Sequence, residues 1–163
     1  MTKSVREGSF RDYNKRTFIE FKYKANEARG KNFAKIVSAF ANTNGGHIIV
    51  GVFEKDGLIK DIQGIPSKEV ENILKSFGLI SPCYEPTHGE IYQELFINNN
   101  KSILIFFIPM ETRLYGVREG SEEDLKIIYY KRVGPESIPI TDNEIPKFKE
   151  EKNRFKELNR IIE

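Results

Sequence analysis

The chain of 163 residues is poor in the residue types that build metal clusters and disulfide frameworks. It contains one cysteine, Cys83, and two histidines. A single cysteine excludes an internal disulfide and a thiolate metal cluster. The two histidines are far apart along the chain, and neither has a second ligand at the spacing of a zinc site. These absences leave oxygen ligands as the candidates for any metal.

Long apolar runs are also absent. No run approaches the roughly 20 residues that a membrane span requires, and the first 16 residues lack the apolar segment of a signal peptide. We therefore expect a cytoplasmic protein without a membrane partner. Hydrophobic residues make up 39% of the chain and charged residues 31%. This length suits one domain with a core but not two, so we predict a single domain over residues 1–163.

The net charge of +2 is unevenly distributed. Residues 1–36 hold ten of the 26 Lys and Arg but only four of the 24 Asp and Glu, which makes this segment +6 and the remainder −4. A basic end on a nearly neutral chain is typical of a protein that binds a phosphate backbone. The same charges also fit a solvated, lysine-rich surface.

Apolar periodicity predicts both helices and strands. We expect strands over residues 17–23, 47–53, 58–62, 90–97, 102–109 and 126–133, and helices over 31–41, 67–76 and 142–163. Turn residues at "KDG" and "NNNK" predict hairpins. This order favours an α+β fold, a single domain in which helices pack on a mixed β-sheet.

Polar residues mark the expected helix starts. Ser67 is the predicted cap of the second helix, and Thr141 with Glu144 has the spacing of a capping box before the last one. The buried stripe of that last helix is predicted to comprise Ile145, Phe148, Phe155, Leu158 and Ile162.

Glu20 and Lys22 are two positions apart on a predicted strand and therefore project from the same face. Many nucleases use this E-x-K arrangement, in which the carboxylate holds a divalent metal and the ammonium stabilises charge on the phosphate. Lys24 extends the same face. The alternative is a polar outer face with a weak ion pair.

A metal site for Mg²⁺ or Mn²⁺ needs a second carboxylate. Asp56 is the first candidate, so Glu20 and Asp56 are the expected metal ligands, with Glu54 and Asp61 as further choices. Asp56 also suits a plain hairpin turn. The "NTNGG" stretch lacks the Lys-Ser/Thr of a P-loop and follows a helix, so we expect no nucleotide or organic cofactor.

The stretch "YYKRVG" over residues 129–134 places two tyrosines beside two cations. Aromatic side chains stack on bases while cations contact phosphates, although an edge strand with interfacial tyrosines fits equally. The expected nucleic-acid-binding residues are Lys15, Arg16, Lys22, Lys24, Arg29, Lys131 and Arg132.

Three stretches together are more specific than any one of them. They are "FIEFKYK", "KIVSAFANTNGGHIIVGVFEKDGLIKDIQGI" and "IIYYKRVGPESIPIT". In order and spacing over residues 18–141 they resemble the Schlafen-like divergent AlbA domain. The resemblance implies a nucleic-acid-binding domain. In the Schlafen branch, two such lobes form a clamp that cleaves structured RNA, tRNA included, with three carboxylates and a divalent metal; a single lobe would reach this clamp as a homodimer.

By this resemblance, the catalytic residues would be Glu20, Lys22 and Asp56. The nuclease branch also carries a glutamate five residues before Glu20, where this chain has Lys15. The positive charge of a lysine at that position repels a metal ion but does not hinder phosphate binding. Three hypotheses follow: binding of DNA or structured RNA through a basic groove, a Mg²⁺- or Mn²⁺-dependent endoribonuclease, and a non-catalytic dimerisation or interaction domain.

Overall fold

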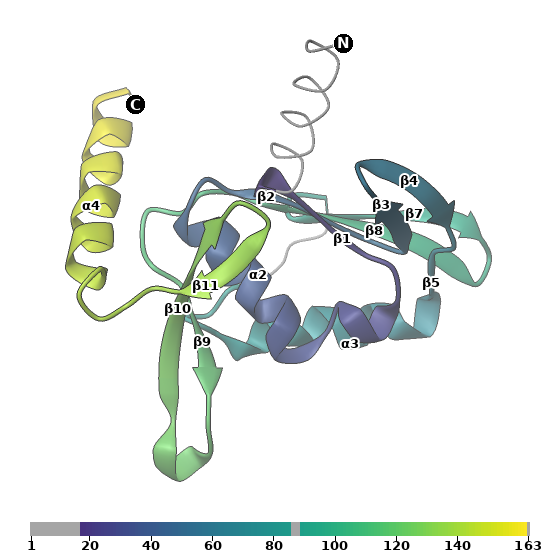
Figure 1. Cartoon of the computed structure of the whole chain (residues 1–163), viewed down its shortest axis with the longest axis horizontal. Coiled ribbons are helices and arrows are strands. Elements are labelled where there is room, and N and C mark those ends of the chain that lie inside the picture. The colour runs from purple at the N-terminus through teal and green to yellow at the C-terminus, as the bar shows by residue number, and fades with distance from the viewer. Residues whose placement is uncertain (1–16, 86–88, 163) are drawn as a thin grey trace.

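The computed structural model describes residues 17–85 and 89–162. The helices of this part are α2 (Gly30–Asn42), α3 (Val70–Lys75) and α4 (Ile145–Ile162), with 3₁₀ turns at Ala25–Glu27, Ser67–Glu69, Ser76–Leu79 and Glu122–Asp124. The strands form sheets of five, four and two strands (Figure 1). The mixed α+β fold predicted from the sequence is confirmed.

The five-stranded sheet has the order β1 (Ile19–Lys22), β2 (Gly46–Val50), β8 (Lys101–Ile108) and β5 (Ile65–Pro66), and β7 (Tyr92–Asn98) also pairs with β8. The β1–β2 pair is parallel and the others are antiparallel, so this sheet is mixed. Alternate residues of β8, such as Leu104 and Phe106, are fully buried. The ring of Phe106 lies 5.2 Å from that of Phe33 in α2.

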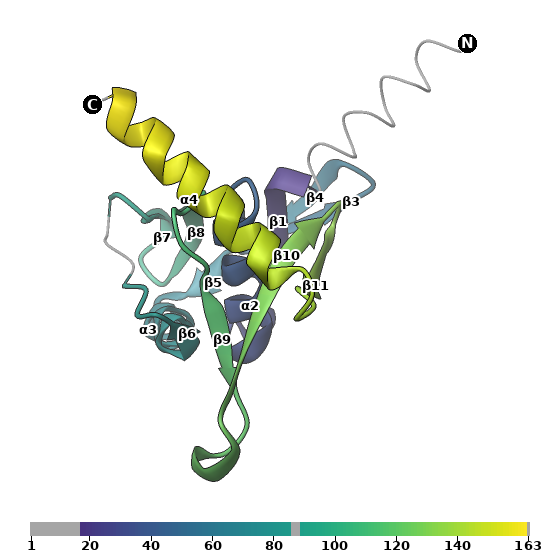
Figure 2. The same cartoon turned by 90° about the vertical axis from the view of Figure 1, so that its left-hand side faces the viewer.

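A second sheet has the order β11 (Glu136–Pro139), β10 (Lys126–Val133), β9 (Gly116–Glu119) and β6 (Ile80–Ser81). Helix α2 contacts strands of both sheets and so links them (Figures 1 and 2). The expectation of one sheet is therefore wrong. Strands β6, β9 and β11 were missed because two to four residues are too few for a recognisable period.

The strand predicted over residues 47–53 is interrupted at Gly51, which separates β2 from β3. Gly51 has φ +101°, and a Cβ there would lie 2.7 Å from the Cα of Gly64. Beyond the break, β3 (Val52–Lys55) pairs only within a hairpin with β4 (Leu58–Ile62) in the described part. The predicted turn at Asp56-Gly57 is confirmed, with φ +54° and +78°.

The "NTNGG" stretch is a structural joint. Asn42 is 2% exposed, and its Nδ2 donates to the carbonyl oxygens of Tyr115 (2.8 Å) and Tyr130 (2.9 Å). Its Oδ1 accepts from the Tyr115 N–H at 2.8 Å. At Gly46 a Cβ would lie 2.7 Å from the ring of Phe40. The motif thus fixes the end of α2 against β10 and the segment that leads into β9.

The second predicted helix is shorter than expected. Only Val70–Lys75 is α-helical, and 3₁₀ turns flank it. Ser67 does not cap it through its side chain; instead its N–H donates to the carbonyl of Asn100 at 2.9 Å. The prediction that Ser67 caps this helix is therefore wrong. The chain enters α3 through a 3₁₀ turn, without a side-chain cap.

Helix α4 begins at Ile145, and Glu144 reaches back to its start as predicted. Its carboxylate accepts from the N–H and the hydroxyl of Thr141, at 3.2 and 2.9 Å. The predicted buried stripe is wrong for Leu158 and Ile162, which are 58% and 83% exposed. Figure 2 shows the reason: the last turns of α4 extend beyond the sheets.

The buried residue of α4 is a lysine. Lys152 is 6% exposed, and its Nζ donates to the carbonyl oxygens of Ala41 (3.1 Å) and Glu111 (2.7 Å). Burial lowers the pKa of Lys152 to about 8. The ammonium group therefore anchors α4 to the end of α2. No helix in residues 17–85 and 89–162 has the length and apolar composition to cross a bilayer.

An ion pair between Glu144 and Lys131 of β10 adds a second anchor for α4. The Lys131 ammonium, with the Thr141 donors, lowers the pKa of Glu144 from 4.5 to about 2. A lowered folded-state pKa adds stability above pH 4.5, and this stability is lost as the pH falls towards 2. We expect urea unfolding to show Glu144→Gln less stable than wild type at pH 6 and equal to it at pH 2. An equal deficit at both pH values would contradict this assignment.

Candidate nucleic-acid interface

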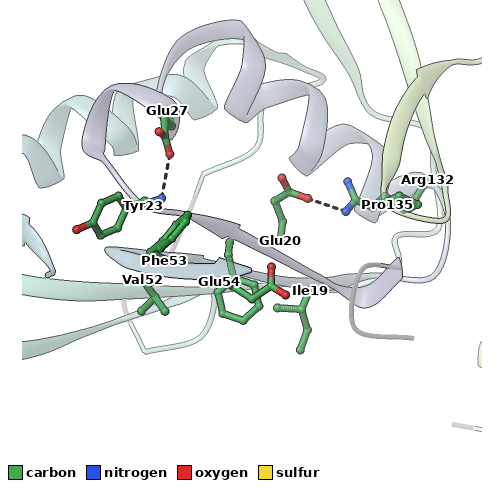
Figure 3. A pocket seen from close by; sticks show the side chains of 10 residues that line it. Ile19, Glu20, Tyr23, Glu27, Val52, Phe53, Glu54, Arg132 and Pro135 are labelled. Carbon is green, nitrogen blue, oxygen red and sulfur yellow. Dashed lines mark hydrogen bonds and ion pairs between the residues drawn. The ribbon is translucent and has the colours of Figure 1, made fainter. Parts of the chain in front are cut away.

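Glu20 lies between two cations that belong to different strands. Its Oε1 is 2.9 Å from the Nζ of Lys22. Its Oε2 is 2.7 Å from the Nη2 of Arg132 (Figure 3). Glu20 is on β1 and Arg132 on β10, 112 positions later. The Arg132 side chain is 3% exposed, donates to the Ser137 hydroxyl at 3.1 Å and lies over the ring of Phe40. The pair thus joins the two larger sheets.

Two cavities, each of about 370 Å³, lie around this ion pair. Glu20, Glu27, Arg132 and Pro135 line both of them. The aromatic cavity is completed by Ile19, Phe21, Tyr23, Val52, Phe53 and Glu54. The cationic cavity is completed by Lys22, Asn32, Lys35, Ile36 and Ser137. We refer to the two cavities together as the cleft.

The aromatic cavity offers a ring surface to solvent. The rings of Tyr23 and Phe53 are 5.3 Å apart at 48°, and Phe53 is 41% exposed (Figure 3). The Tyr23 hydroxyl donates to the carboxylate of Asp61, and this hydrogen bond raises the pKa of Tyr23. Tyr23 is therefore neutral at physiological pH and fixed in place. Exposed aromatic faces of this kind stack on nucleic-acid bases.

The cationic cavity combines charge with neutral hydrogen-bonding groups. The side chains of Lys22 and Lys35 are 23% and 33% exposed, so both reach solvent. The Lys35 Nζ lies 3.7 Å from Glu119 and 5.4 Å from the centre of the Tyr130 ring. Asn32 and Ser137 add an amide and a hydroxyl to the lining. This combination suits a phosphate group.

The carboxylates of the cleft do not form a site for Mg²⁺ or Mn²⁺. Both oxygens of Glu20 already contact cations. Glu27 accepts from the N–H groups of Tyr23 and Lys24, and Glu54 accepts from the N–H of Gly57. No group of three His, Cys, Asp or Glu residues in the described part could hold a metal. The donor set therefore does not fit the ion.

The structure does not bring Asp56 to Glu20. Asp56 is exposed at the turn of the β3–β4 hairpin and lines neither cavity, whereas Glu54 lines the aromatic cavity. Glu54 and Asp56 are two positions apart, so strand alternation alone would place both carboxylates on one face. Glu54 stays in β3, whereas Asp56 leaves the strand at the turn with φ +54°.

Of the expected nucleic-acid-binding residues, Lys22 and Arg132 line the cleft. Lys24 is exposed beside it, Arg29 lies 3.8 Å from Glu69, and Lys131 pairs with Glu144 on the opposite face of β10. Lys15 and Arg16 lie outside the described residues. Sequence reasoning missed Lys35, Tyr23 and Phe53; the alternation of β1 indicated only that Tyr23 does not share a face with Glu20.

The chain has detectable similarity to a protein family and to a solved structure. No curated protein matches the chain. A similar solved structure is the DIP2311 protein from Corynebacterium diphtheriae, with 18% sequence identity and a TM-score of 0.49. The match covers 83% of this chain and 24% of that one, so this chain spans about a quarter of its length. The family model described as Schlafen, AlbA_2 matches residues 15–141, and the chain therefore belongs to the Schlafen AlbA_2 family.

Proposed function

We propose that this protein binds DNA or structured RNA in the cleft. The supporting observation is that an exposed pair of aromatic rings and a cationic cavity adjoin across the Glu20–Arg132 ion pair. Proteins that bind nucleic acid combine stacking surfaces for bases with cations for phosphates. The nucleic-acid binding that the family resemblance implies agrees with this proposal.

Within the cleft, the cations have different roles. Arg132 is buried and holds the two sheets together, so we assign it a positioning role. Lys22 and Lys35 are partly exposed and can turn towards a phosphate. A phosphate in the cationic cavity would compete with Glu20 for Lys22, because both are anions within reach of one ammonium group.

The test is the affinity of a Lys22→Gln, Lys35→Gln double variant for labelled single-stranded DNA, double-stranded DNA and tRNA, measured by fluorescence anisotropy. Two lost phosphate contacts are expected to weaken binding at low salt by about tenfold each. They should also reduce the slope of log K against log salt by about 1.4 for single strands.

Lys68→Gln is the matched control, because Lys68 is exposed and lines neither cavity. It removes one charge and should change affinity less than twofold. Equal losses in Lys68→Gln and in single Lys22→Gln would show that total charge, not the cleft, determines binding. No binding of any of the three nucleic acids at low salt would refute the proposal.

Metal-dependent cleavage of structured RNA is the second function that the sequence predicts. Glu20, Glu27 and Glu54 line one cavity close to Lys22, but their contacts with cations and N–H groups do not favour a metal site. Incubation of the protein with labelled tRNA in the presence of Mn²⁺, Mg²⁺ or EDTA distinguishes cleavage from binding alone. Metal-dependent cutting that disappears in Glu20→Gln would support the nuclease, and intact RNA would support binding alone. Homodimerisation and an interaction-domain role stay predictions.

A further inference from the structure

A third cavity, of about 300 Å³, lies apart from the cleft. Its walls are α4, the segment that joins β8 to β9, one side chain of β10, and Pro82 after β6. The polar residues around it are Thr112, Arg113, Tyr129, Lys149, Lys152 and Asn153. None of the described residues that line the cleft takes part. The cavity is at the lower end of the size range of small-ligand sites.

The charge around this cavity is not balanced. Arg113, Lys149 and Lys152 are cationic, and none of the described residues that line the cavity is Asp or Glu. Within residues 17–85 and 89–162, neither Arg113 nor Lys149 forms an ion pair. Lys152 is 6% exposed and donates to two main-chain carbonyls rather than to a carboxylate. Three cations that line one cavity repel one another, and a bound anion would offset that repulsion.

Two of the cations are held in place. The Arg113 Nε donates to the Tyr115 hydroxyl at 3.1 Å, and its guanidinium lies over the Tyr115 ring at 5.3 Å. Lys152 is fixed by its two carbonyl contacts. Its pKa of about 8 keeps it charged at pH 7. Glu111 attracts both Arg113 and Lys152 but does not line the cavity, and burial raises its own pKa.

The donors favour a particular class of anion. The lining provides a guanidinium fork, the ammonium group of Lys149, two hydroxyls and an amide. The Lys152 ammonium adds positive charge and one further N–H, because its other two donate to carbonyls. Together these exceed what a single carboxylate can use. A phosphate monoester carries about two negative charges and three strong acceptor oxygens. We propose that this cavity binds a phosphate monoester, from either a small phosphorylated molecule or the 5′ end of a nucleic acid.

The test uses the full chain and sodium phosphate, titrated in a calorimeter at pH 7 with ionic strength held constant by sodium chloride. Wild type should bind phosphate, and sodium acetate should bind at least tenfold more weakly. Arg113→Gln and Lys149→Gln each remove a charged donor from an exposed side chain, so each should weaken phosphate binding about tenfold or more.

Lys156→Gln is the matched control, since Lys156 is exposed on the same helix and does not line the cavity. It should bind phosphate within twofold of wild type. A loss in Lys156→Gln equal to that in Lys149→Gln would overturn the proposal. So would the absence of phosphate binding by wild type, or unchanged binding in both cavity variants.

Oligonucleotides with a 5′-phosphate or a 5′-hydroxyl identify the source of the group. Tighter binding of the phosphorylated strand, lost in Arg113→Gln, indicates a nucleic-acid end. Equal binding of the two strands, with phosphate binding intact, indicates a small phosphorylated molecule. Phosphate binding that is lost in the Lys22→Gln, Lys35→Gln variant but unchanged in Arg113→Gln and Lys149→Gln would place the phosphate in the cleft and overturn this proposal alone. Oligonucleotide binding that is unchanged in the Lys22→Gln, Lys35→Gln variant would instead count against the cleft proposal, so the two failures are distinguishable.

Discussion

Replacing Asn42 with alanine is expected to lower the free energy of unfolding by about 2–6 kcal/mol, since two buried backbone groups each lose a partner and each such loss costs about 1–3 kcal/mol. The groups are the N–H of Tyr115 and the carbonyl of Tyr130. Chemical denaturation followed by circular dichroism measures the change. The effect is large because one amide serves backbone groups of two distant segments.

Two further variants test whether the hydrogen bonds are responsible. Asn44→Ala alters an exposed asparagine two positions later and should leave stability almost unchanged. Asn42→Asp should be at least as destabilising as Asn42→Ala, since it would direct a carboxylate at the carbonyls of Tyr115 and Tyr130. If Asn42→Ala unfolds at the same denaturant concentration as Asn44→Ala, the hydrogen bonds of the Asn42 side chain do not stabilise the fold.

Removal of the Phe53 ring is expected to weaken binding of a single-stranded oligonucleotide by about 1–3 kcal/mol, roughly 5- to 150-fold, which is the range for losing one stacked base. Phe53 is 41% exposed and forms one side of the ring pair with Tyr23. Fluorescence anisotropy of Phe53→Ala at low salt measures the loss. The salt slope should be unchanged, because no cation is removed.

Phe96→Ala is the matched control, since Phe96 is 69% exposed on β7 and lines neither cavity. It removes the same side chain from another face and should bind like wild type. If Phe96→Ala and Phe53→Ala lose equal affinity, or if neither loses any, the aromatic cavity is not a stacking site.

The sequence predicted the elements that have a long and regular apolar period. Helix α2 is close to its expected range of residues 31–41, and β8 is close to residues 102–109. The turns at Asp56-Gly57 and between β7 and β8 are confirmed. In each of these the local sequence suffices, because face burial and turn geometry depend on neighbours in the chain.

The parts that the sequence did not predict depend on contacts between distant residues. Gly51 continues an apolar run, and only its approach to Gly64 shows why the strand breaks there. Lys152 has the composition of a surface residue, yet it is buried because two carbonyls receive its ammonium group. To predict the contact of Glu20 with Arg132, one would need to know which face of β10 each of its cations occupies. No local period carries that information.

The most direct measurement of the central claim is photo-cross-linking of the protein to a single-stranded oligonucleotide that contains 5-iodouracil, followed by mass spectrometry of the cross-linked peptides. If a base stacks in the cleft, the cross-links should map to Tyr23 or Phe53 and disappear when unlabelled oligonucleotide competes. If the cross-links that unlabelled oligonucleotide removes all map to peptides outside the cleft, nucleic acid does not bind in the cleft.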